Sequence, residues 1–299
     1  MKSSLPAESP RPTEPAATSP CKVWLNGSLV DESAAHISPF DHGLLTGDGV
    51  FETLIAYADK PFATSLHWER LRRSASVFGL EVPDNETLNK ACGEVIAASG
   101  LSPARIRVTI TGGRAPLGSE KGTSGQTLLI AAGSLPGHGA QADVHTVTYS
   151  RNERSATVGV KTISYGDNVI ALAQAKAKGG TEAIFGNTQG NLCEGTGSNI
   201  FIVRDGRIIT PPLESGCLAG CTRAILLSIC KREGIVVSEE NTPLDELAQA
   251  EEAFLTSTLR EVQAIATVDG KALPTVNGEI TQRLAAAFRA TAESDNDPR

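Results

Sequence analysis

Two residues of this chain have side chains suited to covalent cofactor chemistry. Lys161 lies in the segment 160–165, and Glu194 follows it in the segment 193–201. A lysine amine can form a Schiff base with an aldehyde, and a buried carboxylate can keep a pyridine nitrogen protonated. Either residue alone indicates little, because most lysines are solvated surface charges and a glutamate in a glycine-rich turn is usually a loop residue. Together they predict a site for an aldehyde cofactor built on a pyridine ring.

Regular elements must position these two residues, and the sequence predicts such elements. Lys161 comes just before an Ala-rich helix expected at 167–178, and Glu194 is expected at the end of a strand. The remaining elements follow from helical spacing of apolar residues and from runs of β-branched and aromatic residues. The predicted helices are 66–78, 85–99, 222–233 and 281–291, and the predicted strands are 50–57, 105–111, 127–132, 143–149, 182–186, 199–204, 207–210 and 252–257, with hairpin turns at 26–27 and 205–206. Strands and helices mixed in two halves indicate an α/β or α+β fold.

A length of 299 residues leaves room for about two domains. We expect a linker near 134–141 between a small N-terminal α/β domain, 21–138, and a larger C-terminal α/β domain, 139–292, which holds the cofactor lysine. The Pro- and Ser-rich residues 1–20 are expected to form a disordered tail, and they lack the apolar core of a secretory signal. Residues 293–299 are expected to form a second tail.

Composition excludes several classes of partner. The net charge of -7 and pI of about 5.4 argue against nucleic acid, because phosphate binding needs a basic face. No apolar run approaches the roughly 18 residues of a membrane span, so no membrane partner is expected. The cysteines show no paired CxxC spacing and no adjacent histidine cluster, so neither a metal site nor a disulfide framework is expected. We interpret them as reduced, mostly buried thiols of a cytoplasmic protein.

Several separate motifs occur in the order typical of one family. They are 41–52 (DHGLLTGDGVFE), 67–71 (HWERL), Lys161, 194–199 (EGTGSN), 218–223 (LAGCTR) and 256–258 (TST). From residue 23 to residue 288, the chain resembles the class IV aminotransferases, which are the fold-type IV pyridoxal-phosphate enzymes. The resemblance implies a two-domain α/β (α+β) fold like that of D-amino-acid aminotransferases. It also implies that pyridoxal 5'-phosphate binds between the domains of a homodimer whose partner helps to close the site.

The resemblance assigns three residues to the reacting part of the cofactor. Lys161 is similar to the lysine that forms the Schiff base and then moves the Cα proton as general base. Glu194 resembles the partner of the pyridine nitrogen, which keeps the ring cationic. Tyr165 is placed to donate to the phenolic oxygen of the cofactor, and packing in the core is an equal alternative for this side chain.

Other residues resemble those that hold the cofactor phosphate and ring. Arg70 offers a planar fork suited to phosphate oxygens, and Thr222 opens a helix whose free N–H groups bind phosphate well. Leu218 resembles the residue that packs on the ring, and Asn199 is expected to fix the loop of Glu194. The remaining cofactor-binding residues implied by the matched motifs are Ser198, Gly220, Cys221, Ser257 and Thr258.

The substrate side of the site is less defined by the sequence. Candidate substrate contacts are Phe51, Arg114, Leu259 and His42, where His42 has the alternative of a structural turn residue. Arg107 is a second candidate for the substrate carboxylate, and both Arg114 and Arg107 have the alternative of a surface charge. D-Amino-acid aminotransferases carry an arginine where this chain has Gly112, and branched-chain aminotransferases place their tyrosine five residues after the lysine rather than four, as Tyr165 is. We therefore expect a pocket of neither specialised type.

The function that follows is a pyridoxal-phosphate-dependent aminotransferase. It would move an amino group between a small amino acid or amine and a 2-oxo acid through a lysine Schiff base. A 4-amino-4-deoxychorismate lyase, which eliminates pyruvate to give 4-aminobenzoate for the folate pathway, shares the cofactor contacts and remains the alternative. A catalytically inactive dimeric scaffold is the third reading, and the presence of Lys161, Glu194 and Arg70 counts against it.

Overall fold

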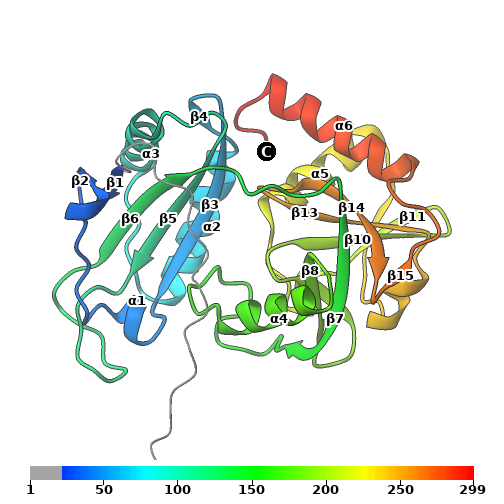
Figure 1. Ribbon diagram of the computed structural model, residues 1–299, viewed down its shortest axis with the longest axis horizontal. Coiled ribbons are helices and arrows are strands. Elements are labelled where there is room, and N and C mark those ends of the chain that lie inside the picture. The colour runs from blue at the N-terminus through cyan, green and yellow to red at the C-terminus, as the bar shows by residue number, and fades with distance from the viewer. Residues whose placement is uncertain (1–21) are drawn as a thin grey trace, which may run out of the picture.

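Two β-sheets, each packed against helices, make up the computed structural model, which describes residues 22–299 (Figure 1). The tail expected at 1–20 lies outside these residues. The first sheet is built from residues up to Gly133, and the second begins with Gln141. The predicted class of mixed α/β fold is confirmed by these two sheets.

The N-terminal sheet has the strand order β2-β1-β6-β5-β3-β4, and all its pairings are antiparallel. Its elements are β1 (Lys22–Leu25), β2 (Ser28–Asp31), α1 (His42–Leu45), β3 (Gly49–Tyr57), β4 (Lys60–Pro61), α2 (Thr64–Val77), α3 (Asn85–Ser99), β5 (Ala104–Thr111) and β6 (Thr127–Gly133). Helix α3 begins where the Asp84 side chain accepts from Thr87 N, and it ends at Gly100 with a φ of 65°.

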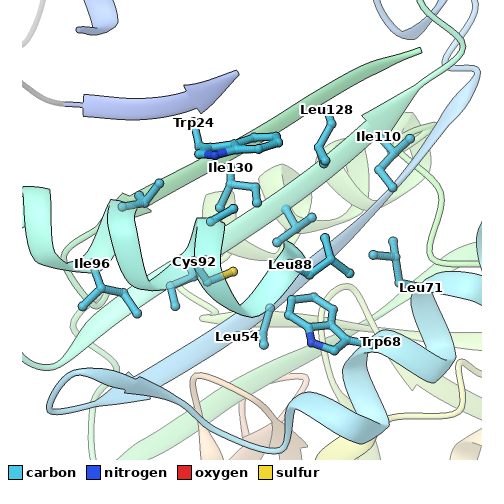
Figure 2. Close-up of a cluster of buried hydrophobic side chains, with 14 of the residues drawn as sticks. Trp24, Leu54, Trp68, Leu71, Leu88, Cys92, Ile96, Ile110, Leu128 and Ile130 are labelled. Atoms are coloured by element: carbon cyan, nitrogen blue, oxygen red, sulfur yellow. The ribbon is translucent and has the colours of Figure 1, made fainter. Parts of the chain in front are cut away.

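Helices α2 and α3 bury their apolar faces against this sheet. Figure 2 shows Trp68 and Leu71 of α2 together with Leu88 and Cys92 of α3 against strand residues such as Ile130. All of these side chains are inaccessible to solvent. Helical spacing placed them on one face of each helix, so the core of this half follows directly from the sequence pattern.

The C-terminal sheet has the order β12-β11-β10-β13-β14-β7-β8-β9, and β15 pairs with β14. The pairs β11/β12, β14/β7 and β7/β8 are parallel, and the others are antiparallel. The elements are β7 (Gln141–Arg151), α4 (Gly166–Ala177), β8 (Glu182–Asn187), β9 (Leu192–Gly195), β10 (Asn199–Arg204), β11 (Arg207–Thr210), α5 (Cys221–Glu233), β12 (Val237–Glu239), β13 (Glu252–Ser257), β14 (Glu261–Val268), β15 (Lys271–Ala272) and α6 (Glu279–Ser294), with short 3₁₀ helices at Leu213–Ser215 and Leu244–Gln249. A further 3₁₀ helix, Glu32–Ala34, follows β2 in the N-terminal half.

A third apolar cluster joins the two halves of the molecule. It combines Ile55 and Phe62 of the N-terminal half with side chains of α5, α6 and the C-terminal sheet. The rings of Phe62 and Phe288 meet edge to face with centroids 5.9 Å apart. Tyr57 also donates a hydrogen bond to Glu261 across 2.7 Å. These contacts fix the two sheets relative to each other.

The structure differs from the expected elements in several places. Strand β14 was not predicted, and it lies in the sheet between β13 and β7. The short elements α1, β4, β12 and β15 were not predicted either. The residues expected as a C-terminal tail, 293–299, instead continue α6 to Ser294 and then dock on α2, where the Asp297 carboxylate accepts from Ser65 N at 2.8 Å. The hairpin predicted at 205–206 is present, with positive φ at both residues. Within residues 22–299, no helix combines the length and the apolar character needed to cross a membrane.

Candidate active site

A cavity of about 500 Å³ is lined by residues of both sheets and of the helices beside them. Most of the residues predicted to bind cofactor or substrate meet around it. Those on its wall are Phe51, Arg70, Lys161, Tyr165, Glu194, Ser198, Asn199, Leu218, Gly220, Cys221, Thr222, Ser257, Thr258 and Leu259. The tertiary structure therefore brings together motifs that are widely separated along the chain.

Lys161 is fixed through its backbone and presents its amine to the cavity. Its carbonyl oxygen accepts from Phe51 N of β3 at 3.0 Å, and its own N–H donates to Ser74 Oγ of α2 at 3.1 Å. The Nζ atom lies 4.4 Å from the centroid of the Phe51 ring. Removal from water, together with the positive charge of Arg70, lowers the pKa of Lys161 to about 8. The amine is therefore closer to its neutral, nucleophilic form than an ordinary lysine.

Glu194 lies in β9 and is held from two sides. Its Oε1 accepts from Arg151 Nε at 3.0 Å, and its Oε2 accepts from Leu218 N at 2.9 Å. Burial raises the pKa of Glu194 above its usual range, and the positive charge of Arg151 opposes that rise. The result is a carboxyl group with a fixed orientation in the cavity wall.

Helix α5 begins at the cavity, and no side chain caps its first turn. The preceding residue, Gly220, must be glycine, because a Cβ there would lie 1.9 Å from Asn199 Oδ1. Asn199 in turn donates from Nδ2 to Leu218 O at 2.8 Å. Cys221 and Thr222 are the first two residues of the helix and are buried. The arrangement leaves backbone donors available for an anion.

Arg70 reaches the cavity from α2, and a buried carboxylate holds it there. Its Nε and Nη2 donate to the two oxygens of Glu52 at 2.8 and 2.6 Å, and its Nη1 donates to Ala219 O at 3.1 Å. Burial would raise the pKa of Glu52, but Arg70 outweighs it and holds that pKa well below its usual range. His67 Nδ1 donates to Glu52 Oε2 at 2.7 Å. Burial would lower the pKa of His67, but Cys221 and Glu52 raise it to about 9.

The turn between β13 and β14 forms another part of the wall. Ser257, Thr258 and Leu259 line the cavity here, and Ser257 Oγ accepts from Arg260 N at 3.2 Å. The hydroxyl of the neighbouring Thr256 is buried in the wall and has no hydrogen-bond partner among residues 22–299. An unsatisfied buried hydroxyl beside free helix amides fits a ligand that carries several acceptor oxygens.

Tyr165 points its ring into the cavity wall, where it meets Phe51 edge to face with centroids 5.3 Å apart. Its hydroxyl donates to Thr196 O at 3.2 Å. Burial raises the pKa of this phenol. The ring of Tyr165 therefore lines the cavity, and its hydroxyl already has a hydrogen-bond partner in Thr196 O.

The structure does not bring two of the predicted substrate contacts to this cavity. His42 is the first residue of α1, and its ring is buried, with Nε2 3.0 Å from Pro116 O and Nδ1 3.4 Å from Asp48 Oδ2. Arg114 lies over the ring of Phe40 at 5.3 Å. Neither residue lines the cavity, and the segments that carry them, just outside β3 and β5, pair with each other through the isolated bridge between Asp41 and Arg114.

Arg107, the other carboxylate candidate offered by the sequence, does line the cavity. It projects from β5 with its guanidinium carbon 3.8 Å from the centroid of the Phe51 ring. Three further residues on the cavity wall had no signal in the sequence. Arg151, Glu182 and Arg260 belong to no recognised motif. Their positions depend on strand register in the C-terminal sheet, which the sequence does not reveal.

Comparison with known proteins gives the class to which this arrangement belongs. The model of the family "Amino-transferase class IV" matches residues 49–268. The chain belongs to the class IV aminotransferases, which are enzymes.

Three proteins illustrate the similarity. A Methanocaldococcus jannaschii protein assigned as a branched-chain-amino-acid aminotransferase is 36% identical over 90% of this chain and 95% of its own. The branched-chain amino acid aminotransferase of T.th., solved with pyridoxamine 5'-phosphate, is 28% identical, with a TM-score of 0.85 over 92% of this chain and 95% of its own. A Legionella pneumophila protein assigned as a 4-amino-4-deoxychorismate lyase is 26% identical to this chain, with a TM-score of 0.81 over 87% of this chain and 96% of its own.

Proposed function

We propose that this aminotransferase binds pyridoxal 5'-phosphate in the cavity between the sheets and uses Lys161 as its Schiff-base residue. The observation that carries the proposal is the meeting of the Lys161 amine, the Glu194 carboxyl group and the open N-terminus of α5 around one cavity. When bound, the cofactor supplies a ring that accepts the electrons of the substrate Cα–H bond. The similarity to an enzyme solved with pyridoxamine 5'-phosphate supports the same choice of cofactor.

Each of these groups has a separate task in the proposed site. Lys161, whose pKa is lowered to about 8, would hold the aldehyde cofactor through its amine and would take up the proton from the substrate Cα. Glu194 is held by Arg151 and the Leu218 N–H so that one carboxyl oxygen can face the pyridine nitrogen. The first turn of α5, with the Thr222 hydroxyl and Arg70, holds the phosphate.

We assign the substrate carboxylate to Arg107 in place of Arg114. Of the arginines on the cavity wall, Arg70, Arg151 and Arg260 each lie within ion-pair distance of a carboxylate. Among residues 22–299, no carboxylate lies that close to Arg107, whose Nε donates to Thr109 Oγ1 at 3.3 Å and whose guanidinium lies over the Phe51 ring. An unpaired guanidinium beside an apolar ring suits a substrate with one carboxylate and an aliphatic side chain.

The proposed reaction is amino transfer from a small aliphatic amino acid to a 2-oxo acid. The name of the M. jannaschii relative supports branched-chain donors, whereas the similarity to the Legionella protein keeps the lyase reaction as the alternative. The purified protein should be given branched-chain amino acids, D-alanine, 1-phenylethylamine or aminodeoxychorismate, with 2-oxoglutarate present. Glutamate formation from an amino acid supports the proposal, and release of pyruvate with 4-aminobenzoate would replace it by the lyase.

A homodimer in the cytoplasm is the proposed setting. Large apolar side chains are exposed on the segment 37–45, namely Ile37, Phe40, Leu44 and Leu45, and others on α4, namely Val169 and Ile170. Figure 1 places α1 and α4 along one edge of the molecule, which suits a contact with a second copy. The buried cysteines among residues 22–299 are free thiols, which suits a reducing compartment. Light scattering of the purified protein tests the dimer.

A further inference from the structure

Glu182 is a buried carboxyl group for which the proposed reaction has no role. It is the first residue of β8, it is 2% exposed, and part of it reaches the cavity wall. Its Oε1 accepts from Thr196 N at 3.1 Å and from the Thr196 hydroxyl, and its Oε2 accepts from Ser198 Oγ at 3.2 Å. Glu182 therefore gathers three donors from the loop that directly follows Glu194.

This close approach is built into the loop. A Cβ at Gly195 would lie 2.3 Å from Ser198 Oγ and 3.2 Å from the Glu182 carboxyl carbon. Only glycine lets the loop fold tightly enough over Glu182 for these donors to reach it. Thr196 and Ser198 thus donate to Glu182, whereas the matched motif implied a cofactor contact for Ser198.

A continuous chain of hydrogen bonds leads from Glu182 to Glu194. The Thr196 carbonyl oxygen accepts from Asn168 Nδ2 at 2.5 Å. Asn168 Oδ1 accepts from Arg151 Nη1 at 3.1 Å, and Arg151 Nε donates to Glu194 Oε1 at 3.0 Å. The same Thr196 carbonyl accepts from Tyr165 OH at 3.2 Å. Movement of Thr196 would therefore disturb both Glu194 and Tyr165.

A second contact runs from Glu182 to the opposite wall. Its Oε2 pairs with Arg260 Nη2 at 3.4 Å, and Arg260 N donates to Ser257 Oγ at 3.2 Å. Arg260 directly follows Thr258 and Leu259, which line the cavity. One carboxyl group thus ties the loop after Glu194 to the turn between β13 and β14.

We propose that Glu182 is a positioning residue that sets the orientation of Glu194 and Tyr165 through Thr196. The inference rests on the proposed function, because the two oriented side chains matter only if the cavity binds pyridoxal phosphate. In the proposed reaction, Glu182 does not touch the reacting atoms of the cofactor or the substrate. It holds the loop after Glu194 in the arrangement that keeps the series of hydrogen bonds from Thr196 to Glu194 intact.

Glu182→Gln tests the inference, because the amide keeps the size but replaces one acceptor oxygen by a donor. Glu252→Gln is a matched control, since Glu252 is also buried and accepts from the N–H and hydroxyl of a threonine, Thr281, but does not line the cavity. Three quantities are measured: the melting temperature, the dissociation constant of pyridoxal phosphate, and the pH midpoint of the visible absorbance band of its Schiff base. Thr196→Val provides a second, milder loss of the same contact.

Both glutamate variants are expected to melt at lower temperature. Only Glu182→Gln should weaken cofactor binding, by about tenfold, because charge-assisted hydrogen bonds are lost. Only this variant should raise the pH midpoint of the visible Schiff-base band. If Glu194 is less well oriented, the pyridine nitrogen of the cofactor holds its proton less firmly. The ring then withdraws less electron density from the Schiff-base nitrogen, which loses its own proton at a higher pH. Thr196→Val should move both quantities in the same direction.

Two results would overturn the inference alone: a Glu182→Gln protein with the wild-type midpoint and affinity, or equal changes in Glu252→Gln. If Glu182→Gln does not fold, an unchanged midpoint and affinity in Thr196→Val have the same meaning. A wild-type protein that shows no visible band with pyridoxal phosphate would overturn the proposed function itself.

Discussion

The guanidinium of Arg151 lies 3.0 Å from Oε1 of Glu194, so the carboxyl group at the centre of the candidate site has a positive partner. Arg151 also lies over the ring of Phe185, with its guanidinium carbon 4.2 Å from the ring centroid. One oxygen of Glu194 is thereby committed to Arg151 and the other to Leu218 N. The fixed carboxylate can meet a pyridinium without reorganisation, which is the condition for strong electrostatic stabilisation.

The first prediction concerns that carboxyl group. Glu194→Gln should keep pyridoxal phosphate bound but lower kcat strongly, because a neutral amide no longer favours the protonated ring. A loss of roughly 2–4 kcal/mol in the barrier is expected, as for other preorganised charges. Steady-state kinetics at saturating cofactor measures it, with the exposed Glu214→Gln as control. An unchanged kcat would refute the role of Glu194.

The second prediction is that borohydride reduction places the pyridoxyl group on Lys161. Peptide mapping should find no label on Lys121, Lys176 or Lys178. Because the pKa of Lys161 is lowered to about 8, the neutral amine fraction rises as pH increases through that value. The rate of Schiff-base formation should rise with pH and level off above about 8, as stopped-flow absorbance can follow. A rate still rising steeply at about pH 10 would indicate an ordinary exposed lysine.

The third prediction separates the two sides of the proposed phosphate site. Thr222→Ala should raise the cofactor dissociation constant by about tenfold with a small effect on stability, since a hydrogen bond to a charged group contributes roughly 1.5–3 kcal/mol. Arg70→Ala should also reduce the free energy of unfolding by about 3–5 kcal/mol, because the carboxylate of Glu52 would remain buried without its partner. Cofactor titration and denaturant unfolding measure the two effects. Wild-type cofactor affinity in both variants would mean that the phosphate is held elsewhere.

The fourth prediction assigns the substrate carboxylate. Arg107→Ala should raise KM for an amino acid by about tenfold or more and change KM for 1-phenylethylamine little, because only the amino acid carries the charge that Arg107 would pair. Arg105→Ala is a matched control from the same strand, since Arg105 is exposed and does not line the cavity. Arg114→Ala should behave as the wild type. A selective loss in Arg114→Ala instead would restore the assignment first made from the sequence.

The fifth prediction concerns the end of the chain. Asp297 accepts from both Ser65 N and Ser65 Oγ, so it caps the start of α2, where Ala63 provides no side-chain cap. Asp297→Ala should reduce the free energy of unfolding by about 0.5–2 kcal/mol, the usual effect of losing a cap. Urea unfolding measures it, and the exposed Glu293→Ala should have no effect. Equal stability of both variants would show that the docked end contributes nothing.

Local pattern in the sequence predicted most of the longer helices and strands. Helical spacing placed Leu71 and Ala75 on one face of the helix expected at 66–78, and both are buried in α2, while the Asp205-Gly206 pair marked a hairpin that the structure contains. These features could be predicted because each depends on neighbours within a few residues of the chain. Lys161, Glu194 and Thr222 came instead from the resemblance of their motifs to one family, and the structure places them on one cavity wall.

Contacts between distant segments were decided by the tertiary structure alone. The sequence favoured Arg114 as the carboxylate partner and offered Arg107 as a second candidate, but only Arg107 lies on the strand face that meets the cavity. The pairing of Glu52 with Arg70, and of Glu182 with the loop after Glu194, depends on strand register and on how the two sheets pack. A one-residue change of register would turn such side chains to the opposite face, and composition carries no information about that choice. The sequence by itself thus determined which reactive side chains this protein carries. The packing of its two sheets determined which other residues position those side chains.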